Sequence, residues 1–169
     1  MLPAEQFLIL IQVIIITIFI PVAIFFLLRS MGLIETVMAS KVAERRIPLI
    51  AQIPLLFLLT QQSITAERLP ELHFFFLGAL LSTVLALLAA FSNFKISLHM
   101  MGMGALLLFT IALSIHLQEN YLIAIALLML LTGIVGSSRL HMGAHSMKEL
   151  FAGFLCGMLP QLLWWRFWL

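Results

Sequence analysis

The chain has 169 residues, of which 63% are hydrophobic and only 9% are charged. Soluble domains are about half apolar and about a quarter charged, so this composition indicates an integral membrane protein. The net charge of +2 is too small and too scattered to support nucleic-acid binding, and a single cysteine excludes an intrachain disulfide.

Apolar runs long enough to cross a bilayer recur along the chain, since a spanning helix needs about 20 residues. The first run follows Glu5, and its length and the lack of a basic segment before it favour a spanning helix over a signal peptide. Pro54 lies inside the second run and predicts a kink. Three tryptophans with Arg166 close the last run, which is typical of an interfacial aromatic belt. The six predicted spans are 6–28, 47–66, 72–94, 96–118, 120–138 and 150–168.

Residues 30–45 separate the first two spans and are intermediate in character. Ile34, Val37, Met38 and Val42 recur at helical spacing, opposite polar side chains. This pattern predicts a short amphipathic helix at the membrane surface, and continuation of the first helix beyond the lipid is the alternative. Without internal repeats or a long linker, the sequence predicts a single all-α domain over 1–169. We expect a six-transmembrane-helix bundle with a short interfacial helix.

Alternate crossings place the loops 29–46, 93–97 and 137–149 on one face of the membrane. The other face carries only Arg68 and Arg166 among the Lys and Arg residues. Cytoplasmic loops collect basic residues, but a phosphate site also needs clustered cations, so the sequence leaves the sidedness open. The cations of the richer face are Arg29, Lys41, Arg45, Arg46, Lys95, Arg139 and Lys148. Of these, Lys95 and Lys148 are interpreted as interfacial anchors, although Lys95 could add positive potential to a site.

A polar island between the last two spans contains Arg139, His145 and Glu149. A charge at the middle of the bilayer costs roughly 2.5–3.5 kcal/mol on insertion scales, so we expect these groups to lie where they are solvated and used. The Arg139 guanidinium can bind an anion through two N–H groups, and the His145 imidazole can act as a nucleophile or base. The Glu149 carboxylate can orient that imidazole. If the chain is helical there, Glu149 lies one turn beyond His145 and can accept its ring N–H. This combination indicates an enzyme.

Three polar segments, 41–48, 95–99 and 138–149, fall on the same predicted face. Their pattern resembles that of the type 2 phosphatidic acid phosphatase (PAP2) superfamily. In that family a Lys is followed by Arg and Pro, then by Ser-Gly-His, and then by Ser-Arg with a downstream His and an Asp four residues later. The third segment matches this spacing, with Glu149 where the family has Asp. The resemblance spans most of the chain.

The first two segments depart from the family pattern. Arg46 is closer to Lys41 than in the family, and one residue separates it from Pro48, so either Arg45 or Arg46 could supply the ligand. Leu98 stands where the family has glycine, which places a side chain at the site and removes the backbone freedom of glycine.

The resemblance implies a phosphatase that needs no metal and no cofactor. Its substrate would be a lipid phosphomonoester or diphosphate of the prenyl diphosphate, phosphatidic acid or phosphatidylglycerol phosphate class. His145 would form a phosphohistidine, Glu149 would orient it, and His99 would protonate the leaving oxygen and then activate water. The implied phosphate ligands are Lys41, Arg46, Arg139, Ser97 and Ser138, with Arg45 and His141 as further candidates.

The sequence is also compatible with two other functions. A degenerate family member would bind anionic lipid headgroups without catalysis, and the Leu98 and Glu149 departures motivate this alternative. A b-type haem or quinone protein would use His99 and His145 as ligands but would leave Arg139 and Glu149 without a role. We expect membrane lipids and a lipid phosphate as partners, no nucleic acid, and a location in the bacterial inner membrane. The oligomeric state is left open.

Overall fold

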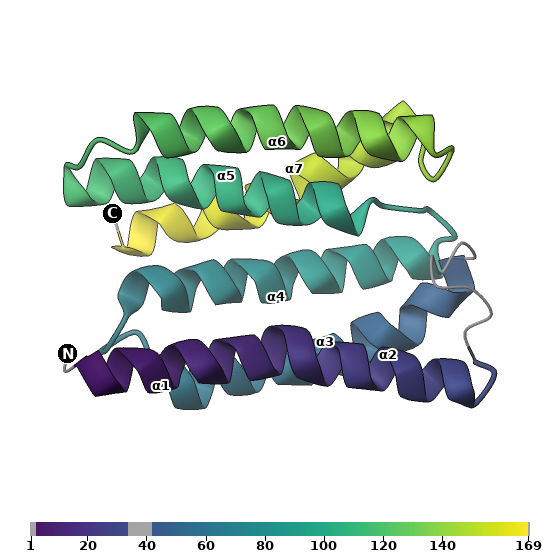
Figure 1. Ribbon diagram of the computed structural model, residues 1–169, viewed down its shortest axis with the longest axis horizontal. Coiled ribbons are helices and arrows are strands. Elements are labelled where there is room, and N and C mark those ends of the chain that lie inside the picture. The colour runs from purple at the N-terminus through teal and green to yellow at the C-terminus, as the bar shows by residue number, and fades with distance from the viewer. Residues whose placement is uncertain (1–2, 34–41, 169) are drawn as a thin grey trace.

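The computed structural model describes residues 3–33 and 42–168, and every element in these ranges is helical. These elements form six helical rods. The rods lie side by side (Figure 1). The first rod is continuous, with a π-helical turn between two α-helices, and the second rod ends in another π-helical turn. The elements are α1 (Pro3–Ile14), η1 (Ile15–Phe19), α2 (Ile20–Ser30), η2 (Val42–Arg45), α3 (Arg46–Leu58), η3 (Leu59–Ser63), α4 (Pro70–Phe91), α5 (Leu98–Leu117), α6 (Leu122–His141) and α7 (Met147–Trp168).

The all-helical architecture confirms the predicted fold class, and each predicted span corresponds to one rod. Within the described ranges, four helices are long and apolar enough to cross a membrane: Ala4–Ser30, Pro70–Phe91, Leu98–Leu117 and Leu122–His141. The rods that contain α3 and α7 do not meet this standard. In α7 the apolar run is interrupted by Pro160, Gln161 and Arg166. The predicted interfacial helix falls largely on residues 34–41, which lie outside the described residues.

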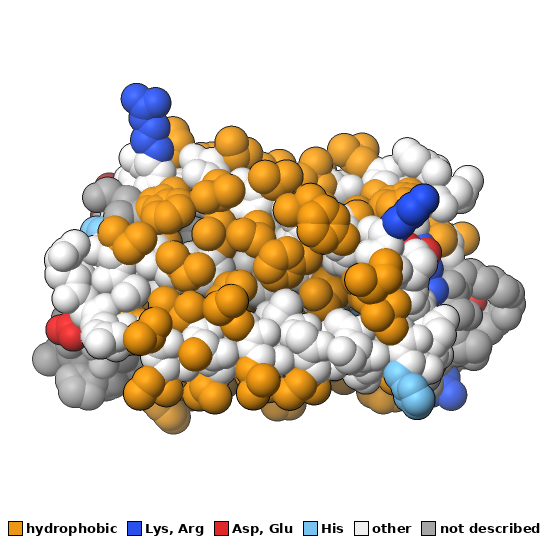
Figure 2. Space-filling view, turned by 90° about the horizontal axis from the view of Figure 1, so that it is seen from above, with side chains coloured by type: hydrophobic (Ala, Val, Ile, Leu, Met, Phe, Trp, Pro, Cys, Tyr) orange, Lys and Arg blue, Asp and Glu red, His pale blue; other side chains and the backbone are white. Residues whose placement is uncertain are grey.

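The loops lie at the two ends of the bundle in the alternation that successive membrane crossings require. The connections at 92–97 and 142–146 and the start of α3 lie at one end of the bundle, and both termini lie at the other (Figure 1). Figure 2 shows apolar side chains over the middle of one face, with charged and histidine side chains toward its two ends. This distribution is the one expected of helices that contact lipid at their centre and polar surroundings at their ends.

Helix α7 packs closely against α5 through small residues. A Cβ on Gly153 or Gly157 of α7 would overlap the backbone of Ser97 or Met101 of α5, and one on Gly104 of α5 would overlap the carbonyl of Phe154. Small residues therefore allow these two helices to pack closely within the bundle. This close approach holds the first turns of α5 and α7 together at the loop-rich end.

Gly157→Ala is expected to destabilise the folded protein by about 1–3 kcal/mol, because the added methyl group would overlap the Met101 carbonyl oxygen. Thermal unfolding in detergent measures this as a lower midpoint. Gly133→Ala on α6 is the matched control, since a Cβ there meets no atom within 4 Å. Equal midpoints for the two variants would contradict this account of the packing.

Candidate active site

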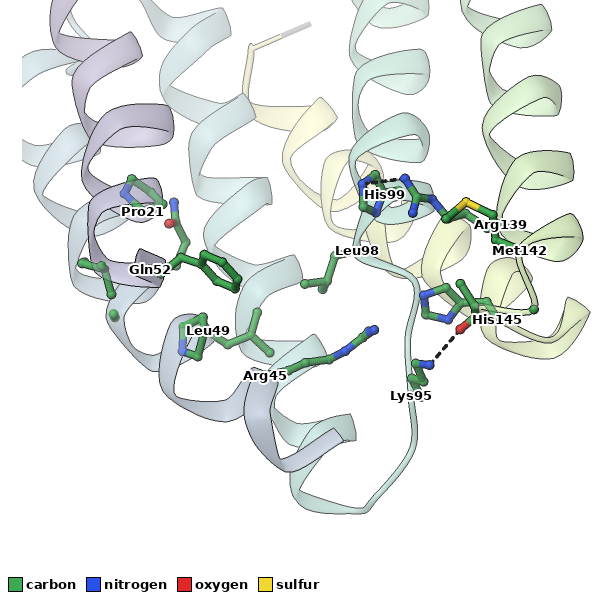
Figure 3. A pocket seen from close by; sticks show the side chains of 16 residues that line it. Pro21, Arg45, Leu49, Gln52, Lys95, Leu98, His99, Arg139, Met142 and His145 are labelled. Carbon is green, nitrogen blue, oxygen red and sulfur yellow. Dashed lines mark hydrogen bonds between the residues drawn. The ribbon is translucent and has the colours of Figure 1, made fainter. Parts of the chain in front are cut away.

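A cavity of about 620 Å³ opens at the loop-rich end of the bundle, and polar and apolar side chains form opposite walls (Figure 3). The polar wall carries Lys95, His99, Arg139 and His145, and Arg45 reaches the cavity from the start of α3. The other lining side chains of α2 and α3 are mostly apolar. Hydrogen bonds join the three predicted segments here. The described residues of the three segments therefore lie together, as alternate membrane crossings led us to expect.

His145 is oriented by Glu149 at the start of α7. The His145 side chain is only 5% exposed, and its Nδ1–H donates to Oε2 of Glu149 at 2.8 Å. The proton on Nδ1 leaves Nε2 with a free lone pair, and His145 lines the cavity. The expected pairing of these two side chains is therefore present, but His145 lies in the loop two residues before α7 and not in the helix.

The Glu149 carboxylate also caps the N-terminus of α7, the helix to which Glu149 belongs. Its Oε2 accepts the backbone N–H of Ser146 at 3.3 Å, and the Ser146 hydroxyl accepts the backbone N–H of Glu149 at 3.4 Å. This reciprocal pair is a capping box, for which Glu at the third helical position has the needed length. The Ser-x-x-Glu pattern was readable in the sequence, and it gives a structural reason for Glu149 where the related family has Asp.

Two contacts fix the loop that precedes His145. Gly143 adopts φ 60°, and the backbone N–H groups of Gly143 and Ala144 donate to the carbonyls of Leu140 and Arg139 at 2.9 and 3.1 Å. These bonds form a Schellman motif that ends α6 and turns the chain toward the cavity. Lys95 then donates through Nζ to the Ala144 carbonyl at 2.7 Å. Lys95 also lines the cavity, as the interpretation that it adds positive potential to a site requires.

Arg139 and His99 contact each other across the polar wall. The Arg139 NH2 group lies 3.2 Å from His99 Nε2 (Figure 3). A guanidinium can only donate, so His99 Nε2 accepts and carries no proton in this arrangement. The Nε atom of Arg139 is buried without a hydrogen-bond partner in the described chain. A bound anion would satisfy that donor, as charged oxygens are its preferred acceptors.

The two adjacent arginines of the first segment point to different places. Arg45 lines the cavity and donates to the Ile96 carbonyl at 3.0 Å. Arg46 instead donates to the Ala90 carbonyl at 3.1–3.2 Å and to the Asn93 side chain at 3.0 Å. Arg46 therefore satisfies the last turn of α4, where cations are favoured. Of the two arginines that were left as alternatives, Arg45 lines the cavity and Arg46 does not.

Several other predicted ligands lie away from the cavity lining. Ser97 is fully buried and caps α5, because its Oγ accepts the Met100 backbone N–H at 3.4 Å. Ser138 is exposed in the last turn of α6, and so is His141. Lys41 lies outside the described residues. Leu98, at the family's glycine position, does line the cavity.

Burial lowers the pKa of His145 below its ordinary value of 6.5. The positive charges of Arg45 and Lys95 lower the pKa further, while Glu149 opposes them through its hydrogen bond and its charge. A depressed pKa means that the imidazole stays neutral at pH 7 and binds a proton only at lower pH. His145 is thus held as an unprotonated nucleophile or base.

Lys95→Met is expected to raise the pKa of His145 toward 6.5, because it removes a nearby positive charge and loosens the Ala144 contact. An NMR titration of histidine-labelled protein in detergent measures the shift. Lys148→Met is the control, since Lys148 is exposed and does not line the cavity. The same titration midpoint in both variants would show that Lys95 does not act on His145.

In residues 3–33 and 42–168, no group of three or more His, Cys, Asp or Glu side chains is arranged to hold a metal ion. No family model, curated protein or solved structure matches this chain. What the site can do chemically follows from its own residues: an oriented neutral imidazole, a second histidine, and three cations that face one cavity.

Proposed function

We propose that the protein is a membrane lipid phosphatase that hydrolyses a phosphomonoester or diphosphate of a lipid. One observation carries the proposal: the neutral, Glu149-oriented imidazole of His145 faces a cavity that Arg45, Lys95 and Arg139 also line. The cations attract a phosphate dianion and disfavour protonation of the imidazole, which are the two conditions for nucleophilic attack on phosphorus. The spacing from Arg139 to Glu149, which resembles the PAP2 pattern, supports the same reaction.

The proposed reaction proceeds in two displacements. Nε2 of His145 attacks phosphorus, the new N–P bond forms, and the bond from phosphorus to the lipid oxygen breaks. His99 takes up a proton from solvent when the phosphate binds and gives it to that leaving oxygen, and Glu149 stabilises the positive imidazole ring. In the second step water attacks phosphorus and gives its proton to His99. The N–P bond breaks, phosphate leaves, and His145 returns to its neutral form.

Arg139 links substrate binding to the acid role of His99. Arg139 donates to His99 Nε2, and that atom can bind no proton while the contact lasts. A phosphate oxygen is the stronger acceptor, because hydrogen bonds between two charged groups are stronger than those to a neutral ring. Binding of the phosphate therefore draws the Arg139 donors away and leaves His99 Nε2 available to a proton.

The surroundings of the cavity favour a lipid substrate over a soluble one. In the part of the chain that the structure describes, four helices have the length and hydropathy to cross a membrane, and the cavity wall from α2 and α3 is mostly apolar. A headgroup can then reach the cations while its tails stay in hydrocarbon. We extend the proposal to six crossings, one for each rod, because α1 begins and α7 ends on the same side of the bundle (Figure 1). The proposed location is the bacterial inner membrane.

Phosphate release from purified protein in detergent tests the proposal. Suitable substrates are farnesyl diphosphate, phosphatidic acid and phosphatidylglycerol phosphate, assayed without added metal. We expect release from at least one of them, and slower release from the water-soluble p-nitrophenyl phosphate. Binding of these lipids without release would favour the alternative of a non-catalytic headgroup-binding protein. The absence of both binding and release would contradict the phosphatase proposal and the headgroup-binding alternative.

A further inference from the structure

The backbone of Ser97 is held against the first two turns of α7. Its N–H donates to the Glu149 carbonyl at 3.2 Å. A Cβ at Gly153 would overlap the Ser97 carbonyl oxygen and would lie 3.1 Å from the Ser97 nitrogen. Glycine at position 153 therefore lets the chain before α5 approach the backbone of α7 this closely.

Ser97 also fixes the first turn of α5. Its side chain is fully buried, and its Oγ accepts the Met100 backbone N–H at 3.4 Å. Its carbonyl accepts the Met101 backbone N–H at 3.0 Å, which begins the hydrogen bonding of the helix. His99 lies inside the turn that these two bonds close. A displacement of Ser97 therefore displaces the His99 ring as well.

The segment that carries the proposed nucleophile meets the same contact from the side of α7. Glu149 binds the backbone of Ser97 through its carbonyl and the ring of His145 through its carboxylate. His99 follows Ser97 by two positions, so one backbone hydrogen bond connects the segments of both rings. Figure 3 shows the two rings on the same wall of the cavity. Their relative placement therefore depends on how closely α5 and α7 meet here.

We propose that Gly153 is a positioning residue that places His99, the proton donor, relative to a phosphorus atom bound at His145. This inference rests on the proposed phosphatase function. In that reaction the attacking nitrogen and the leaving oxygen lie roughly in line, so the proton donor must lie beside the leaving oxygen. A methyl group at position 153 would overlap a backbone atom, and only a shift of the backbone relieves such an overlap.

Gly153→Ala tests the inference through the leaving group. A lipid alkoxide that leaves dioleoyl phosphatidic acid needs the proton of His99, whereas p-nitrophenolate leaves without one. We expect the first-turnover rate with dioleoyl phosphatidic acid to fall by about 10²-fold, the effect of a displacement of about 1 Å, and that with p-nitrophenyl phosphate to stay nearly unchanged. An equal loss with both substrates would overturn the inference, because a general disturbance of packing lowers both rates.

Gly78→Ala is the matched control for packing. A Cβ at Gly78 would overlap the Gln161 side chain, so the variant disturbs the contact of α7 with α4. At about 1.5 Å per residue, Gln161 lies about 18 Å along α7 from Glu149. We expect a lower thermal midpoint but the wild-type ratio of the two first-turnover rates. A ratio altered as much as in Gly153→Ala would contradict a specific role of the Ser97 contact.

Ser97→Ala loosens the same turn without introducing an overlap. It removes the cap of α5, and we expect a first-turnover rate about fivefold lower with dioleoyl phosphatidic acid, the effect of one helix cap. The rate with p-nitrophenyl phosphate should again change little. Equal losses with both substrates would indicate that the Ser97 hydroxyl binds the phosphate, and would overturn its role in placing His99.

A spectroscopic measurement separates this inference from the proposed function. NMR spectra of histidine-labelled protein in detergent report the hydrogen bonds of each ring nitrogen. In Gly153→Ala we expect the His99 signals to change, because Nε2 then leaves its 3.2 Å contact with Arg139. The His145 signals should stay, because Glu149 moves with that ring. This result would support the inference even if the wild type releases no phosphate, and unchanged His99 signals would overturn it even if the wild type is an active phosphatase.

Discussion

Replacing His145 by alanine is expected to reduce phosphate release from lipid substrates by at least about 10³-fold, because it removes the atom that attacks phosphorus. The Glu149 partner then has no ring to orient, although it still caps α7 through Ser146. The fold should therefore be retained, with an unchanged thermal midpoint in detergent. Single-turnover assays with the preferred lipid phosphate measure the loss.

His141→Ala is the control for this variant. His141 lies four residues earlier, is exposed, and does not line the cavity. Its replacement should leave phosphate release within about twofold of the wild type, as expected of surface changes away from a site. Activity in His145→Ala close to that of His141→Ala would rule out His145 as the nucleophile.

The second large effect is expected at Arg139. Arg139→Lys keeps a positive charge but loses the planar fork that matches two phosphate oxygens, so kcat/KM should fall by about 10²-fold. The loss should appear with every phosphate substrate, because Arg139 binds the group common to all of them. Steady-state kinetics on two lipid phosphates and on p-nitrophenyl phosphate measure it.

A double-mutant cycle with His99→Ala separates the two roles of Arg139. If Arg139 both binds phosphate and donates to His99 Nε2, the two losses are coupled, and the double variant is less impaired than the product of the single effects. Independent, multiplicative losses would show that the 3.2 Å contact between these side chains has no role in the reaction.

The helices were predictable because hydrophobic runs of spanning length are a strong signal, and their order fixes which loops share an end. Alternate crossings alone brought residues 41–48, 95–99 and 138–149 together, and the bonds from Arg45 to Ile96 and from Lys95 to Ala144 confirm that proximity. The pairing of His145 with Glu149 also followed from local spacing. Residues four positions apart can meet without any tertiary contact, here at the helix N-terminus that Ser146 caps.

The directions of individual side chains were not predictable from the sequence. Arg45 and Arg46 are adjacent, and only the position of the last turn of α4 decides that Arg46 binds its carbonyls while Arg45 faces the cavity. Ser97 was expected at the phosphate, but the close packing of α5 on α7 buries it as a helix cap. Lys95 contacts a carbonyl 49 residues away, which no local pattern encodes.

Trapping the covalent intermediate tests the central claim most directly. Wild-type protein is mixed with a lipid phosphate that it hydrolyses, quenched in alkali to preserve phosphohistidine, and digested for mass spectrometry of the peptide that contains His145. Nucleophilic attack by Nε2 of His145 predicts a phosphoryl group on this imidazole, present during turnover and absent in His145→Ala. Phosphate release from the wild type without phosphorylation of His145, or with phosphorylation of another side chain, would contradict the proposed chemistry.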